Sequence, residues 1–161
     1  MSLAVRPWLR HALAALAAAV SILLLTTLMP SPAHAAAKAS PGTPAFSVKV
    51  LANAAKHKGK PYRWGATGPR AFDCSGYTRW VMRKAVGKKL PRTSRAQARW
   101  TKRVSKRHVR PGDLVFMARH GRVYHVSIYA GRGKVWNAPH TGARVRKERI
   151  WTRGWFGGRV R

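Results

Sequence analysis

The chain has 161 residues, with 33 Lys or Arg, only 3 Asp or Glu and a formal net charge of +30 at pH 7. So few acids exclude a surface stabilised mainly by ion pairs and a metal site rich in carboxylates. The single cysteine excludes an intramolecular disulfide and argues against a structural zinc site, so we expect no metal and no cofactor. With 45% hydrophobic residues, the chain can still form a globular core in a single domain.

The N-terminus has the layout of a secretory signal peptide. A basic start is followed by Ala12 to Met29, which contains no charged residue, and then by the small residues of the segment AHAAA. This pattern predicts a signal peptide over residues 1–35 that is cleaved after Ala35, with Ala37 as an alternative. A retained membrane anchor is the competing interpretation, since such a stretch can just span a bilayer. Cleavage would leave an exported protein without a stable membrane anchor.

Helical patterns occupy the first half of the remaining chain. We interpret residues 36–46 as a short linker because they are small and contain proline. Apolar spacing predicts a first helix over residues 46–58. A second helix is expected to open at Asp73-Cys74-Ser75 and to close at Gly87, and a third piece follows Ser94.

From Leu114 the pattern changes to that of strands, with the runs LVFM, VYHVSIYAG and KVWNA separated by short turns. Helices followed by meandering strands predict an α+β domain over residues 47–161. Its N-terminal helices would pack on a central antiparallel β-sheet.

Cys74 is the strongest candidate for a catalytic residue. It follows a loop rich in Gly and Pro and begins a predicted helix, where free N–H groups and the helix dipole lower a thiol pKa. The alternative is an inert buried thiol. His125 lies in an alternating strand that would place it on one face with Val123, and it could serve as the base. Asn137, twelve residues on in the next predicted strand, could orient its ring.

Six segments in this order resemble the NlpC-like cell-wall cysteine peptidases: GKPYRWGATGP, FDCSGYTRWVM, LPRTSRAQ, RPGDLVFM, HVSIYAG and VWNAPHTG. The resemblance covers residues 47 to 161 and implies a minimal papain-like fold. It also implies hydrolysis of peptidoglycan stem peptides, typically between D-γ-glutamyl and diaminopimelate or lysine.

The same resemblance implies roles for individual residues. Cys74 matches the nucleophile and His125 the general base, and Asn137 falls at the third, ring-orienting position, for which His140 is the alternative. Tyr62 matches a tyrosine that assists the oxyanion site. Asp73 and Ser75 match positions that bind the polar groups of the stem peptide.

Two further function classes compete with a secreted peptidoglycan endopeptidase. One is an amidase or acyltransferase that uses the same Cys–His pair, and the other is a basic exported protein that binds an anionic polymer or nucleic acid. The basic runs are spread along the chain, for example KHKGK and TKRVSKRHVR. We expect them to hold an enzyme located at the cell wall through anionic wall polymers. We expect no specific nucleic-acid partner, and we expect a monomer.

Overall fold

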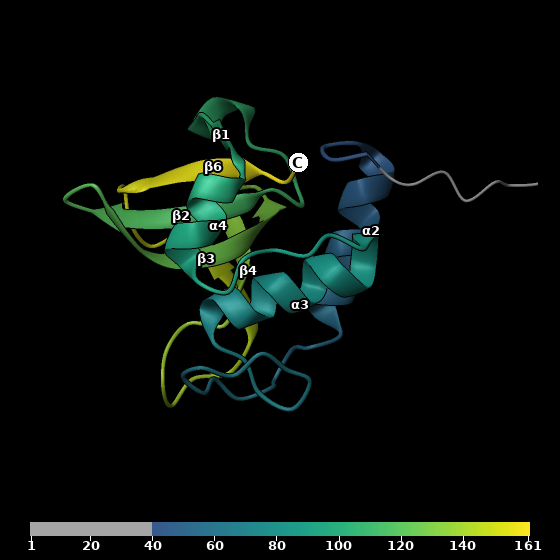
Figure 1. The fold of residues 1–161 in the computed structure, drawn as a ribbon, viewed down its shortest axis with the longest axis vertical. Coiled ribbons are helices and arrows are strands. Elements are labelled where there is room, and N and C mark those ends of the chain that lie inside the picture. The colour runs from purple at the N-terminus through teal and green to yellow at the C-terminus, as the bar shows by residue number, and fades with distance from the viewer. Residues whose placement is uncertain (1–39) are drawn as a thin grey trace, which may run out of the picture. The chain divides into compact units, whose positions relative to one another are not determined.

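The computed structural model describes residues 40–161, so the predicted signal peptide and the first four residues of the predicted linker, 36–39, lie outside the described residues. Figure 1 shows helices α2, α3 and α4 lying against one face of a six-stranded antiparallel sheet. The predicted α+β architecture is confirmed. The helices are α2 (Pro44–Ala55), α3 (Cys74–Val86) and α4 (Ser94–Trp100), with a 3₁₀ turn at Lys106–His108.

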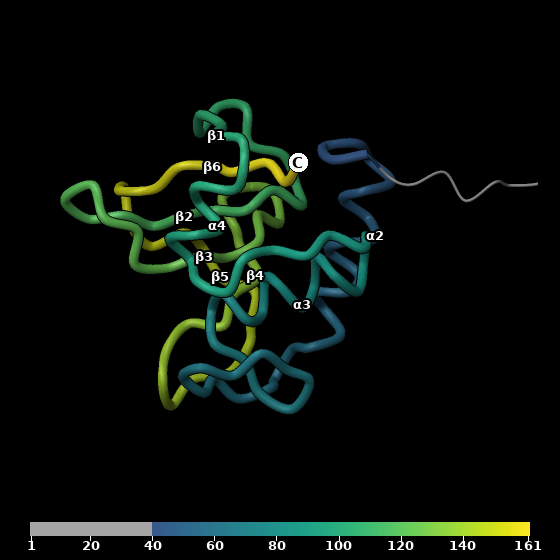
Figure 2. Tube along the Cα trace, in the orientation of Figure 1, coloured from purple at the N-terminus to yellow at the C-terminus, as the bar shows by residue number. Residues whose placement is uncertain are grey.

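The sheet has the strand order β1-β6-β2-β3-β4-β5. Figure 2 shows the C-terminal strand, in yellow, returning to lie beside β2. The two centre strands β2 and β3 form a hairpin, and β4 and β5 extend the sheet on the β3 side. The strands are β1 (Lys102–Val104), β2 (Leu114–Arg119), β3 (Arg122–Gly131), β4 (Lys134–Asn137), β5 (Arg146–Arg149) and β6 (Trp155–Arg159).

The first helix begins inside the segment that we interpreted as a linker. The Thr43 side chain accepts a hydrogen bond from the Phe46 N–H, and Pro44 occupies the first turn, where its missing N–H costs nothing. Phe46 is only 1% exposed and packs in the main core. Residues 44–46 are therefore helical, because a buried aromatic anchors them to the domain.

The second helix has the predicted ends. The Asp73 side chain caps it by accepting from the Gly76 N–H, and Gly87 ends it with a left-handed backbone at φ 72°. Its buried face includes Tyr77, whose hydroxyl donates to the Ala54 carbonyl of α2 at 3.0 Å. This contact joins the two helices beneath the start of α3.

Three strands lack the signals by which the others were predicted. β5 has the sequence RKER, and β1 comes from a basic run, so neither shows an apolar alternation. β6 contains Gly157 and Gly158, which are unusual inside a strand. A Cβ at Gly158 would lie 2.4 Å from the Phe116 ring, so glycine is needed for β6 to approach its neighbours. No helix within residues 40–161 is long and apolar enough to cross a bilayer.

Candidate active site

Cys74 is the first residue of α3, and the loop before the helix fixes its position. The Asp73 carboxylate accepts from Gly65 N–H at 3.0 Å and from Gly76 N–H at 2.7 Å, which ties the loop to the helix. A Cβ at Gly76 would lie 2.2 Å from the Ala66 carbonyl oxygen, so only glycine allows this close approach. Gly76 of the DCSG segment thus allows the start of α3, with Cys74, to pack closely against the preceding loop.

His125 lies on β3 next to an irregularity in the strand. Met117 pairs with His125 and Ala118 pairs with Val123, so Tyr124 has no partner on β2. Such a bulge interrupts the alternation of faces. Val123 accordingly packs on the main helix-side core, and the prediction of one unbroken face for His125 and Val123 is wrong. His125 itself is 5% exposed.

A chain of hydrogen bonds fixes the protonation of the His125 ring. Asn137 Oδ1 lies 2.6 Å from His125 Nε2, and Asn137 Nδ2 donates to Glu148 Oε1 at 2.6 Å. An ionised carboxylate only accepts, so the amide NH₂ must face Glu148 and the amide oxygen must face the ring. His125 Nε2 therefore carries the proton, which leaves Nδ1 free to accept one.

Cys74 and His125 line the same cavity, which has a volume of about 630 Å³. Three exposed aromatic side chains form part of its wall: Trp64 is 84% exposed, and Tyr124 and Trp151 are each 50% exposed. The Trp151 ring also lies edge-on to the His125 imidazole, with a centroid distance of 5.5 Å. The lining is Tyr62, Trp64, Cys74, Tyr124, His125, Pro139, His140, Thr141, Arg146, Glu148 and Trp151.

Burial dominates the electrostatics of both candidate catalytic groups. Desolvation, followed by the nearby Asp73 carboxylate, raises the pKa of the Cys74 thiol, while hydrogen bonds from Val126 and Ser75 act in the opposite direction. The expectation that the helix N-terminus leaves this pKa lowered is therefore wrong. Desolvation lowers the pKa of His125, opposed by the Asn137 hydrogen bond and by Glu148. Both shifts favour the uncharged forms of the two groups, a thiol and a neutral imidazole.

The remaining candidates from the sequence fall into two groups. Tyr62 lines the cavity, and burial, followed by the proximity of Cys74, raises the pKa of its hydroxyl. Asp73 and Ser75 are buried and do not line the cavity. Arg92 forms an ion pair with the Asp73 carboxylate and donates to Ser75 Oγ at 3.0 Å. Any contact of this pair with substrate would therefore involve the half-exposed Arg92.

His140 and Asn137 occupy different environments. His140 lines the cavity, but it is exposed, and its Nδ1 lies 2.9 Å from the Thr141 carbonyl oxygen. Asn137 is fully buried and contacts the His125 ring. Of the two, Asn137 is the one that can hold the imidazole in a fixed orientation.

Two residues of the site escaped the sequence analysis. Glu148 was noted only as one of the few acids, yet it contacts both Asn137 and Arg146. Arg92 lies in the LPRTS segment and had no role assigned. The one available signal for Glu148 was the scarcity of acids, because a single glutamate within a basic segment stands out among only 3 acidic residues.

Comparison with known proteins gives a consistent result. The family model described as "NlpC/P60 family" matches residues 59–159. The "Probable endopeptidase p60" of Listeria monocytogenes is 48% identical over 106 residues, which cover 66% of this chain and 21% of that protein. The "Bifunctional muramidase/DL-endopeptidase CwlT" of Bacillus subtilis is 40% identical over 108 residues, covering 63% of this chain and 32% of that protein. The chain thus spans about a fifth to a third of the length of these two relatives.

A solved structure extends the likeness to three dimensions. The NlpC/p60 domain of the peptidoglycan hydrolase SagA superposes with a TM-score of 0.65 at 32% identity. The match covers 70% of this chain and 97% of that domain, so it includes both the helices and the sheet.

Proposed function

Because the chain belongs to the NlpC/P60 family of cysteine peptidases, we propose that it is a peptidoglycan endopeptidase that uses Cys74, His125 and Asn137. The observation that carries this proposal is the shared cavity of Cys74 and His125, with His125 Nε2 held by Asn137. In this proposal the other ring nitrogen serves as the base for the Cys74 nucleophile, which lines the same cavity. Asn137 is a positioning residue, and Glu148 in turn positions Asn137.

The reaction follows from the resting protonation state. His125 Nδ1 takes the Cys74 proton as the sulfur attacks the carbonyl carbon of the scissile amide, so no preformed thiolate is required. The C–N bond then breaks, and His125 returns the proton to the leaving amine. This leaves a thioester on Cys74. Water attacks the thioester carbon and His125 takes its proton. The C–S bond then breaks as His125 passes that proton to the sulfur, which gives a carboxylic acid and the free thiol.

Neighbouring groups have auxiliary roles in this proposal. Peptide N–H groups at the start of α3 are candidates to bind the oxyanion, and the Tyr62 hydroxyl assists them. Asp73 and Ser75 act through Arg92, which presents a cation to a carboxylate of the stem peptide. Substitutions of Asp73, Ser75 and Arg92 should therefore affect substrate binding more than the chemical step.

The proposed scissile bond joins D-γ-glutamyl to diaminopimelate or lysine. Support comes from the family resemblance and from the name of the Bacillus subtilis relative, which includes a DL-endopeptidase activity. The exposed Trp64 and Trp151 give the cavity flat apolar walls against which the carbon chain of a stem peptide can pack.

Export and retention at the wall complete the proposal. Residues 1–35 would direct export and be removed with Arg6 and Arg10, which leaves 31 Lys or Arg against 3 acids, and this net charge of +28 would hold the enzyme to anionic wall polymers. Adsorption to isolated walls should then weaken steeply as salt rises from about 50 to 200 mM, because the release of counterions that drives binding becomes less favourable and the charges are screened.

Mass spectrometry of stem-peptide fragments tests the activity directly. The chain lacking residues 1–35 should release fragments cut at the γ-glutamyl bond, and the Cys74→Ser variant should release none. Cleavage at another bond would redirect the proposal to an amidase. Equal fragment release by the Cys74→Ser variant would refute the cysteine mechanism.

A further inference from the structure

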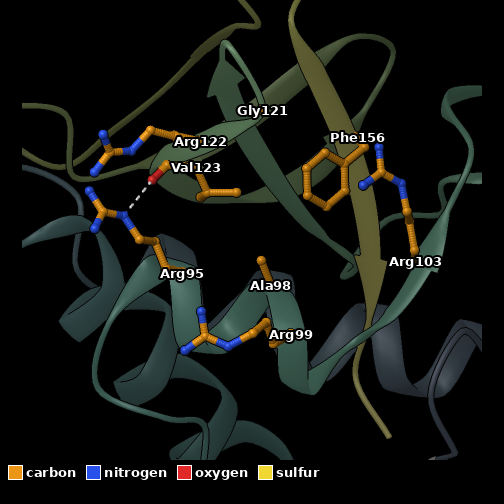
Figure 3. Close-up of a pocket in the computed structure, with 8 residues that line it drawn as sticks. All are labelled: Arg95, Ala98, Arg99, Arg103, Gly121, Arg122, Val123 and Phe156. Atoms are coloured by element: carbon orange, nitrogen blue, oxygen red, sulfur yellow. Dashed lines mark hydrogen bonds between the residues drawn. The ribbon is translucent and has the colours of Figure 1, made fainter.

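A second cavity lies under α4, away from the catalytic cavity, and has a volume of about 360 Å³. Figure 3 shows side chains from α4, β1, β3 and β6 surrounding it. Four of the eight lining residues are arginines, and the others are small or apolar. The arginines are Arg95, Arg99, Arg103 and Arg122, and the remaining lining residues are Ala98, Gly121, Val123 and Phe156.

This arginine pocket, as we call the cavity, holds uncompensated positive charge. All 3 acidic residues of the chain lie within the described range, and each forms an ion pair with an arginine elsewhere. The four arginines of the pocket therefore have no carboxylate partner in residues 40–161. Like charges in one concave site repel one another, and an anion placed among them relieves that repulsion.

Two of the four guanidinium groups are held in place without a ligand. Arg95 Nε donates to the Val123 carbonyl oxygen at 3.3 Å, the bond drawn as a dashed line in Figure 3. The Arg103 guanidinium stacks over the Phe156 ring at 3.8 Å from its centroid. Less side-chain freedom is then lost when an anion binds, which favours binding.

We propose that the arginine pocket binds phosphate groups of a polyol-phosphate polymer of the cell wall. Planar guanidinium groups bind phosphate oxygens in pairs, and the tetrahedral oxygens of a phosphodiester can be approached from more directions than the two oxygens of a planar carboxylate. The apolar side chains of Ala98 and Val123 accept the carbon atoms of the polyol. This inference rests on the proposed function, which places the enzyme at the wall, and it gives the electrostatic retention a defined site.

The position of the pocket links it to catalysis. Val123 lies at its floor, and His125 lies two residues further along β3, at the catalytic cavity. Two residues of a regular strand span about 7 Å, and the bulged segment from Val123 to His125 spans no more than this. A polymer seated in the pocket would therefore hold the enzyme with its catalytic cavity close to the wall.

Nucleic acid carries the same phosphodiester groups but fits the pocket less well. Single-stranded nucleic acid is bound by base stacking on exposed aromatic rings. Here the accessible aromatic ring of the pocket is that of Phe156, and Arg103 already stacks on it. The pocket therefore offers phosphate contacts without a free platform for a base.

Affinity measurements on the inactive Cys74→Ala chain test the proposal. The probes are a polyglycerol-phosphate oligomer, polyglutamate of equal charge and a single-stranded oligonucleotide. The pocket variant carries Arg95→Gln, Arg99→Gln and Arg122→Gln. The control variant removes three exposed arginines that line none of the cavities described: Arg70→Gln, Arg107→Gln and Arg149→Gln.

The pocket variant should bind polyglycerol phosphate at least about ten-fold more weakly, because it loses charge-assisted hydrogen bonds, while the control variant should lose about two-fold or less. Polyglutamate and the oligonucleotide should lose affinity to a similar small extent in both variants. An equal loss of polyglycerol-phosphate binding in the two variants would overturn the proposal. So would a loss specific to the pocket variant for polyglutamate or for the oligonucleotide.

Folding and catalysis are followed separately. Thermal unfolding verifies that each variant is folded, and the single Arg99→Gln variant, which breaks no internal hydrogen bond within the described residues, should still lose several-fold in affinity. Turnover of a soluble stem peptide by the unaltered chain tests the proposed function alone. The two proposals can therefore fail independently.

Discussion

Replacing Asn137 by alanine removes the group that holds the catalytic imidazole. Asn137 is fully buried and His125 is 5% exposed, so water cannot easily replace the lost amide oxygen. A buried donor left unsatisfied costs about 1–3 kcal/mol. If the variant needs this free energy to hold His125 in the orientation that catalysis requires, kcat/KM should drop by about 5- to 150-fold. Glu148 also loses its amide donor, so we expect the upper part of this range.

Steady-state hydrolysis of a soluble stem peptide, monitored by chromatography of the products, measures this loss. The matched control is His140→Ala, which removes an exposed side chain of the same cavity and should change kcat/KM by less than about three-fold. Thermal unfolding of both variants separates loss of activity from loss of fold. A greater loss for His140→Ala than for Asn137→Ala would show that the third residue had been assigned incorrectly.

Three further outcomes follow from the site. The acid limb of the kcat/KM profile should lie below pH 6.5, because burial lowers the pKa of His125 and the base is lost as pH falls through that pKa; a limb above 6.5 would contradict this. Alkylation of Cys74 by iodoacetamide should accelerate with a midpoint above its ordinary pKa of 9.0, whereas a fast plateau near neutral pH would reveal a preformed thiolate. Gly76→Ala should lower the free energy of unfolding by about 1–3 kcal/mol in denaturant titrations, because its methyl group meets the Ala66 carbonyl; the gain of about 1 kcal/mol that helix propensity alone predicts would refute that contact.

Local patterns made much of the fold predictable. Asp73 and Gly87 bound α3 because a side-chain cap and a left-handed glycine act within a few residues. Strands β2, β3 and β4 were predicted from apolar runs and short turns. The first helix begins earlier than expected because the burial of Phe46 depends on the rest of the domain.

The candidate site was predictable only in part. Cys74 was singled out by its uniqueness and its place at a helix start, and His125 and Asn137 by their neighbouring strands. Glu148 was not, because β5 is charged at every position and gives no strand signal. Its contact with Asn137 depends on the pairing of β4 with β5, which is a long-range property.

The sequence by itself determined a strongly basic chain with one thiol at a helix start and the order of its main helices and strands. Only the tertiary structure decided the net direction of the Cys74 pKa, the bulge beside His125 and the gathering of four arginines from three elements. The physical reason is the same in each case. Desolvation, strand register and charge clustering depend on residues that are distant in the chain, whereas caps and alternation depend on residues that are near.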